Sequence, residues 1–191
     1  MSASILTLVG IVVALVVIAG WAVAAYNGLI NKRMTTRNSW SQIDVQLKRR
    51  YDLIPNIVAT VKGYAAHERD TLKRVTEARN LAVEAHGVAE QARAENMLTG
   101  ALKSLFAVTE AYPDLKANQN FLQLQEELTA TENRIGFARQ NYNDVVAQYN
   151  SAVQSVPTNI VANTFGFKPS EFFVLAPGEA SEVQNRVAVS F

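Results

Sequence analysis

The sequence contains no cysteine, and this absence removes several kinds of protein at once. Disulfide-stapled folds need paired cysteines, while thiolate metal sites and cysteine nucleophiles need the sulfur atom itself. A reducing compartment does not follow, because chains without cysteine also occur in oxidising ones. The missing residue type therefore limits the chemistry of this protein and not its location.

Histidine is nearly absent as well, with His67 and His86 as the two examples. His67 opens a His-Glu pair that lacks the second histidine of a zinc-binding HExxH helix, and no Glu-x-x-His of a di-iron bundle is present. The sequence also lacks Gly-x-Ser-x-Gly and a glycine-rich phosphate loop. The adjacent Glu126 and Glu127 favour a solvated helix face. We therefore predict no catalytic residue, no metal and no cofactor, in a protein that is not an enzyme.

Charge is missing from everything before Lys32. Residues 5–25 read ILTLVGIVVALVVIAGWAVAA, in which Thr7 is the one conventionally polar side chain. As a helix this run is about 30 Å long, the thickness of the hydrocarbon core of a bilayer. Trp21 and Tyr26 lie near its end, where amphipathic rings favour the membrane interface. We predict a transmembrane anchor over residues 1–27.

A cleavable signal peptide is the alternative, since Ala22-Val23-Ala24 resembles a cleavage site. The leading Met-Ser-Ala-Ser carries no basic residue, however, and the apolar run exceeds a typical signal core, so we favour an uncleaved anchor. Lys32, Arg33 and Arg37 follow the apolar run. The positive-inside rule then predicts a single-pass protein with a cytoplasmic body, while the periplasmic orientation stays open.

Residues 28–156 show helical periodicity in three stretches. The third carries apolar positions at alternating steps of three and four residues, which is a heptad seam. It begins near Tyr112-Pro113-Asp114 and ends before Pro157, because proline suits the first turn of a helix and breaks the turn before it. The seam positions are Phe121, Leu124, Leu128, Thr131, Ile135, Ala138, Tyr142, Val145, Tyr149, Ala152 and Val156.

Two earlier stretches supply the partner helices. The first carries its stripe on Trp40, Ile43, Leu47, Ile54, Val58, Val61 and Ala65 and can continue into the membrane helix, with a kink expected at Pro55. The second runs from about residue 68 to 110 with an alanine-rich face, weakened at Gly87 and Gly100. We predict an all-α protein in which the transmembrane helix is followed by an elongated antiparallel bundle of three long helices.

Residues 157–191 differ from the bundle because they hold Phe165, Phe167, Phe172, Phe173 and Phe191, five of the eight phenylalanines. Disordered tails are poor in aromatic residues. We predict an extended aromatic tail that docks on its own bundle or on a neighbouring subunit, with its own bundle favoured. The alternation in residues 185–191 predicts a short terminal strand.

The charges are unevenly distributed. Residues 32–74 carry ten basic and four acidic side chains, whereas the rest of the chain carries eight basic and thirteen acidic ones. Lys32, Arg33 and Arg37 lie close enough to the membrane to favour anionic lipid. The Lys48-Arg49-Arg50 triplet favours a protein contact, with facing acids such as Glu132 or with a second subunit. Nucleic acid is not predicted, because interleaved acids dilute the patch and no binding motif accompanies it.

The stretch from Trp40 to Glu68 resembles the signature of the LemA family of bacterial membrane-anchored helical proteins, and weaker similarity covers nearly everything after the anchor. This resemblance implies an N-terminal membrane helix in the bacterial inner (cytoplasmic) membrane and a helical body, without implying a reaction. A related magnetosome protein adds, by analogy, a role in membrane organisation. The matching residues are Tyr26-Asn27, residues 40–50, 52–56, 61–64, 67–68, 77–79, 132–135, Arg139, Tyr142-Asn143, residues 157–162, 165–167 and Phe172-Phe173.

Two functions therefore compete. The first is a non-enzymatic scaffold that self-associates as a homo-oligomer at the lipid bilayer and organises or remodels it. The second is an adaptor or regulator that binds another membrane or envelope-stress protein, such as a peptidase. Trp40, Lys48, Arg49, Arg50, Pro55 and the phenylalanines Phe165, Phe167, Phe172 and Phe173 are the predicted bundle or subunit contacts in both.

Overall fold

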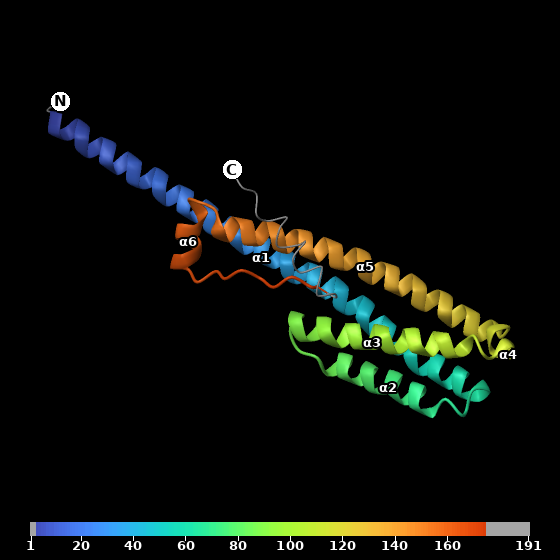
Figure 1. The fold of residues 1–191 in the computed structure, drawn as a ribbon. Coiled ribbons are helices and arrows are strands. Elements are labelled where there is room, and N and C mark those ends of the chain that lie inside the picture. The colour runs from blue at the N-terminus through green and yellow to red at the C-terminus, as the bar shows by residue number, and fades with distance from the viewer. Residues whose placement is uncertain (1–2, 175–191) are drawn as a thin grey trace, which may run out of the picture. The chain divides into compact units, whose positions relative to one another are not determined.

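A computed structural model describes residues 3–174 of the chain (Figure 1). Helices account for all the regular secondary structure in this part of the chain, so the all-α prediction and the long apolar N-terminal helix are confirmed. The helices are α1 (Ala3–Tyr64), α2 (Arg69–Glu84), α3 (Val88–Thr109), α4 (Pro113–Lys116), α5 (Gln119–Gln154) and α6 (Thr158–Thr164).

The chain divides into two compact units, each made of two chain segments. Unit 1 combines residues 1–38 with residues 145–170, and unit 2 combines residues 39–144 with residues 171–191. Helices α1 and α5 thus contribute residues to both units, whereas α2, α3 and α4 belong to unit 2 and α6 to unit 1.

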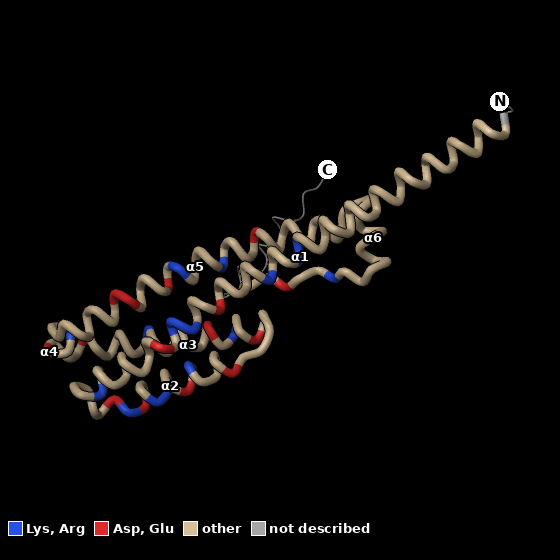
Figure 2. The backbone as a smooth tube through the Cα atoms, turned by 180° about the vertical axis from the view of Figure 1, so that it is seen from behind, with Lys and Arg blue, Asp and Glu red and all other residues tan. Residues whose placement is uncertain are grey.

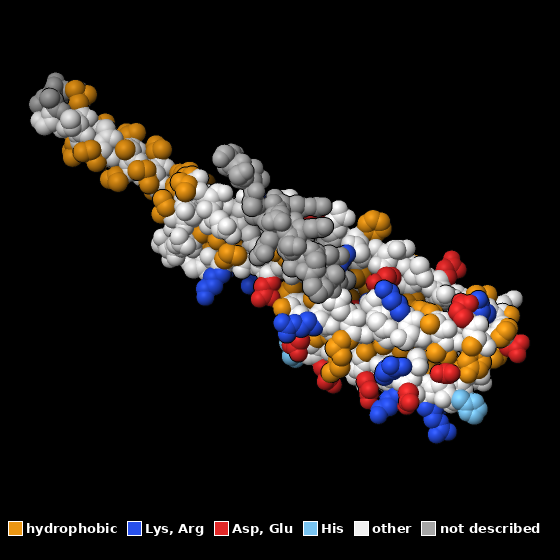
Figure 3. Space-filling model, in the orientation of Figure 1, with side chains coloured by type: hydrophobic (Ala, Val, Ile, Leu, Met, Phe, Trp, Pro, Cys, Tyr) orange, Lys and Arg blue, Asp and Glu red, His pale blue; other side chains and the backbone are white. Residues whose placement is uncertain are grey.

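The apolar stretch of α1 in unit 1 is exposed along its length. Trp21 is 39% exposed and Val16 65%, and Figure 3 shows hydrophobic side chains covering this part of the helix. The mean hydropathy reaches 2.7 with none of that window buried, so α1 is long and apolar enough to cross a membrane. A soluble core helix would bury this surface, and burial here requires lipid or another chain.

Beyond residue 38, α1 buries most of the stripe that its sequence predicts, with Trp40 and Val58 half-buried. Ile43, Leu47, Ile54 and Val61 are each at most 1% exposed. The helix passes through Pro55 as one element, with the proline ring on the exposed side. In unit 2, α1 and α5 run antiparallel, because hydrogen bonds join Asn141 to Ser39 at one end and Asn118 to Tyr64 at the other.

The single second helix expected over residues 68–110 is wrong. Two helices, α2 and α3, form a hairpin instead, with Ala85 extended and Gly87 at φ +84° between them. A positive φ is easy for glycine and strained for other residues, so Gly87 allows the turn from which α3 starts. Unit 2 therefore contains four long helical segments where three were predicted.

The third predicted helix begins later than its proline suggested. Pro113 starts the four-residue α4, and α5 follows after Asn118, whose side-chain Oδ1 accepts a hydrogen bond from the Phe121 N–H at 3.0 Å. Asparagine in this position caps a helix N-terminus. Most seam positions from Phe121 to Tyr149 are buried, and the others are half-buried, namely Leu124, Ala138 and Val145. The burial then follows Val153 and leaves Val156 79% exposed. A straight helix repeats every 3.6 residues, so a strict heptad pattern drifts off the buried face.

The described part of the tail is not extended throughout. Residues 158–164 form α6, whose Val161 and Ala162 are buried. Residues 167–174 then run without helix or strand along their own chain, as described below. The strand predicted for residues 185–191, with Phe191, lies outside the described residues.

Candidate functional site: a buried ion pair and two asparagine clamps

Arg50 is the most buried cation in the predicted contact set, at 2% exposure. Its Nη1 donates to Glu95 Oε2 on α3 at 2.9 Å, and its Nη2 donates to Thr99 Oγ1 at 2.9 Å. The same Nη2 lies 3.2 Å from Glu132 Oε2 on α5. The guanidinium thus joins three helices of unit 2, and Glu132 is the facing acid that the sequence analysis named as an example.

Glu95 is held from a second side by a tyrosine and a glutamine. Tyr51 OH donates to Glu95 Oε1, and Gln91 Nε2 lies 2.8 Å from Tyr51 OH and 3.2 Å from Glu95 Oε1. Burial raises the pKa of Glu95 above its ordinary value, although the Tyr51 hydroxyl, Arg50 and Gln91 act in the opposite direction. Burial and the nearby Glu95 carboxylate likewise raise the pKa of Tyr51, so that its hydroxyl stays a donor.

Pro55 connects to this cluster through the backbone. Proline has no N–H, so the carbonyl four residues earlier, that of Tyr51, loses its helical donor. Arg79 Nε on α2 donates to the Tyr51 oxygen at 3.3 Å. The proline thus leaves the Tyr51 carbonyl free to accept a hydrogen bond from α2. This bond connects α2 to α1 at Tyr51, the same residue whose hydroxyl donates to Glu95.

The buried cluster offers no surface for a substrate. Its acid is 2% exposed, and its cation has two carboxylate partners. Among residues 3–174, no group of three or more His, Asp or Glu could hold a metal ion. Buried ion pairs of this kind fix which helices face each other and in which register. The cluster is therefore best understood as the lock of the α1–α3–α5 arrangement.

A second polar feature of unit 2 holds the tail. The Asn143 side chain bonds both backbone groups of Phe173, an arrangement called an asparagine clamp below. Its Nδ2 donates to the Phe173 backbone carbonyl oxygen at 3.1 Å, and its Oδ1 accepts from the Phe173 N–H at 2.9 Å. Tyr142 OH donates to the backbone carbonyl oxygen of Glu171 at 2.9 Å. Burial raises the pKa of Tyr142 to about 12. The Phe173 ring is fully buried and lies 5.3 Å from the ring of Trp40. Phe172 beside it is half-buried.

Unit 1 repeats this arrangement with other residues. Asn150 clamps Ser170, donating to its oxygen at 2.9 Å and accepting from its N–H at 2.8 Å, and Tyr149 OH donates to the Lys168 oxygen at 3.1 Å.

The two clamps share a sequence signal. Each is a Tyr-Asn pair on α5, and the pairs are seven residues apart, while the tail residues they hold are three apart.

The aromatic residues of unit 1 surround the end of the apolar stretch. The Tyr26 ring lies 4.8 Å from that of Phe165 and 5.7 Å from that of Phe167. The Arg33 guanidinium lies over the Phe167 ring, 5.0 Å from its centroid, in a cation–π contact. The structure thus brings together four residues that the sequence analysis selected for two different roles, interface and tail contact.

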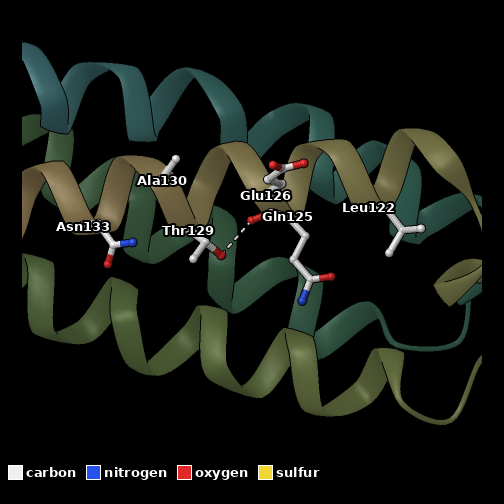
Figure 4. A pocket seen from close by; sticks show the side chains of 6 residues that line it. All are labelled: Leu122, Gln125, Glu126, Thr129, Ala130 and Asn133. Atoms are coloured by element: carbon white, nitrogen blue, oxygen red, sulfur yellow. Dashed lines mark hydrogen bonds between the residues drawn. The ribbon is translucent and has the colours of Figure 1, made fainter.

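Other predicted site residues lie on the surface: Trp21, Lys32, Arg37, Lys48 and Arg49 are exposed. Hollows on the described surface are open and shallow. One is lined by six residues of α5, of which only Glu126 is titratable (Figure 4). Another lies between α1 and α5 in unit 2, where Val45 is 62% and Phe137 76% exposed. Neither brings together groups suited to catalysis.

Sequence reasoning missed Glu95, Gln91 and Asn150. It named Tyr142, Asn143 and Tyr149 as core or family residues only. Glu95 and Gln91 interrupt an alanine- and leucine-rich helix face four residues apart, which is a detectable signal for a buried polar pair. The signal for the two clamps is a Tyr-Asn dipeptide that occurs twice, seven residues apart, starting at Tyr142 and at Tyr149.

Comparison with known proteins places this architecture in a family. A protein LemA from Metamycoplasma hominis is 29% identical over 83% of this chain and 71% of its own length. Magnetosome protein MamQ 1 of Paramagnetospirillum magneticum is 26% identical over 80% of this chain and 65% of its own, and MamQ of Magnetospirillum gryphiswaldense is 25% identical over 78% and 64%. The LemA family model matches residues 39–191, which include the buried ion pair and both clamps. The chain therefore belongs to the LemA family.

Proposed function

We propose that this protein is a non-enzymatic, membrane-anchored helical scaffold that self-associates at the bacterial inner membrane and organises or remodels it. The carrying observation is that α1 passes without interruption from an exposed apolar stretch into the buried stripe of the body. The polar interior is closed around an ion pair, which supports a mechanical role over a chemical one. The names of the relatives, LemA and magnetosome protein MamQ, support a membrane-associated, non-enzymatic protein in the same direction.

The contact surface for self-association is the hollow between α1 and α5 in unit 2. Phe137 and Val45 expose large apolar side chains there, flanked by Gln42, Gln46 and Arg134. A second copy of the chain covers this apolar pair and brings positively and negatively charged regions of two copies together. The anchor holds the body in the cytoplasm, with Lys32, Arg33 and Arg37 on the inner side.

Crosslinking in native membranes tests self-association directly. Because the chain has no cysteine, Phe137→Cys introduces a single reactive site. A bifunctional thiol reagent is expected to yield covalent dimers from Phe137→Cys and few from Ser104→Cys, an exposed control on α3. Phe137→Glu should reduce the particle mass of the detergent-solubilised protein. A monomer in both measurements would contradict the scaffold proposal.

Exposed cations favour the second candidate, an adaptor that binds another membrane or envelope-stress protein such as a peptidase. Lys48 and Arg49 project to solvent, whereas Arg50 is committed to Glu95. Pull-down of the full-length protein from solubilised membranes is then expected to recover one stoichiometric foreign protein. Reversing Lys48 and Arg49 to glutamate should release it, and Lys103→Glu, an exposed control on α3, should not.

A further inference from the structure

Unit 1 contains no acidic residue. Residues 1–38 and 145–170 carry four cations, Lys32, Arg33, Arg37 and Lys168, and neither Asp nor Glu. The apolar stretch of α1 and the whole of α6 carry no charge of either sign (Figure 2). A surface of one sign beside an uncharged apolar surface suits an anionic bilayer better than a protein of mixed charge.

Helix α6 packs on the end of the apolar stretch. Its buried Val161 and Ala162, with Phe167, form a cluster with Leu29, Tyr149 and Val153, against which Ala22, Ala25 and Tyr26 are partly buried. Ala22 and Ala25 belong to the run predicted to cross the membrane. Contact with these residues holds α6 at the level where that run ends, beside α1 in the same unit (Figure 1).

Residues 156–165, which include α6, expose large apolar side chains. Val156 is 79%, Ile160 62% and Phe165 61% exposed, although Val161 and Phe167 next to them are buried. Lys32, the first charge of α1, follows Tyr26 by six residues, a rise of about 9 Å. Phe165, which contacts the Tyr26 ring, thus lies on the apolar side of the first charge.

We propose that residues 156–165 are a second membrane contact, lying in the interface of the bilayer that α1 crosses. Val156, Ile160 and Phe165 enter the acyl boundary, as apolar side chains of interfacial segments do. Lys32, Arg37 and Lys168 take anionic lipid headgroups. The segment packs against the end of the exposed apolar stretch, with Phe165 in contact with Tyr26, and this proximity identifies its partner as lipid. The inference rests on the proposed anchoring by α1 and adds a second point of attachment, made by residues 156–165.

Because the chain has no cysteine, each single cysteine substitution provides one labelling site for the test. The full-length protein is prepared with single substitutions Ile160→Cys or Phe165→Cys, labelled with an environment-sensitive fluorophore, and reconstituted in vesicles of phosphatidylcholine and phosphatidylglycerol. Val13→Cys is the reference within the anchor, and Leu122→Cys, an exposed apolar position on α5 in unit 2, is the matched control. Unchanged helical circular dichroism qualifies each variant.

Brominated lipids are expected to quench the labels at positions 13, 160 and 165, with blue-shifted emission, and to leave position 122 unchanged. If the labels at positions 160 and 165 are quenched as weakly as the label at 122 while the label at 13 is quenched, the second membrane contact is overturned and the anchoring by α1 is not. An unquenched position 13 would overturn the anchoring itself. Omitting phosphatidylglycerol should weaken quenching at 160 and 165 alone, and equal quenching in both lipids would overturn the role given to the cations.

Discussion

Both units are built on parts of α1 and α5, but unit 1 buries apolar side chains, whereas unit 2 also buries charged and polar ones. Unit 1 takes α1 up to residue 38 and the end of α5, and its interior is aliphatic and aromatic, with Arg33 lying over a phenylalanine ring. Unit 2 takes the rest of α1 and most of α5, and it buries an arginine–glutamate pair with a tyrosine and a glutamine.

This difference teaches what each interior has to specify. Apolar packing is strong but not directional, so it tolerates sliding of one helix along another. A buried ion pair adds little net stability, and its strict geometry rejects other registers. Unit 2 joins four helical segments and needs such a lock. In unit 1, α6 packs on the exposed apolar stretch of α1 and Asn150 holds Ser170, and a buried charge there would have no acid of the same unit as its partner.

The largest expected effect comes from breaking the lock of unit 2. Arg50→Met leaves Glu95 buried without its cation, and removing one partner of a buried pair costs about 3–5 kcal/mol. Denaturant unfolding of the full-length protein in detergent, followed by circular dichroism, measures the loss. Arg49→Met, at the exposed neighbour, is the control, and its expected change is within about 0.5 kcal/mol.

A double substitution sharpens the same comparison. Arg50→Met with Glu95→Met removes both charges, and apolar replacement of a buried pair is often neutral or stabilising. Most of the loss in Arg50→Met should therefore be recovered. If the double variant is as unstable as the single one, the unpaired charge is not the cause, and Arg50 acts through packing.

The two asparagine clamps give the next effect, one in each unit. Asn143→Ala or Asn150→Ala removes two hydrogen bonds to a tail residue, a loss of about 1–3 kcal/mol. Hydrogen exchange is expected to lose protection at the Phe173 N–H in the first variant and at the Ser170 N–H in the second. Asn133→Ala, at an exposed position of α5, should change neither. Equal loss at both amides in one variant would show that the clamps are not independent.

How far the sequence predicts this molecule depends on the range of the interaction. The buried stripe of α1 and the seam of α5 follow from local periodicity, and the burial of Ile43 and Phe121 agrees with it. The sequence marks Gly87 as a weak point of one long helix, whereas the structure ends α2 at Glu84 and starts α3 after Gly87, which has a positive φ. Periodicity gives the buried face of a helix and not the side chain opposite. For this reason Glu132 was expected near Arg50, whereas Glu95, its closest partner, was missed.

Glu95 also makes the stability of unit 2 depend on pH. Its pKa is raised in the folded protein, so between the ordinary glutamate value and the raised one the folded chain binds more protons than the unfolded chain. Stability therefore falls as pH rises through this window, with a slope of at most about 1.4 kcal/mol per pH unit for one proton. Glu95→Gln should flatten the slope. Chemical denaturation at a series of pH values measures it, with Glu127→Gln as a control on α5, and an unchanged slope would assign the dependence to another group.

The smallest effect tests whether Pro55 acts through the carbonyl that it leaves free. Arg79→Met removes the donor to the Tyr51 oxygen and should cost about 1 kcal/mol in the natural chain. Pro55→Ala supplies an N–H four residues after that oxygen, so the same Arg79→Met change should cost less in the alanine background. The difference between the two costs is the coupling energy of a double-mutant cycle, expected at about 0.5 kcal/mol or more for residues that share a partner. A coupling near zero would mean that the proline and the arginine act separately, and that the link from α2 to the Glu95 cluster does not depend on a missing backbone donor.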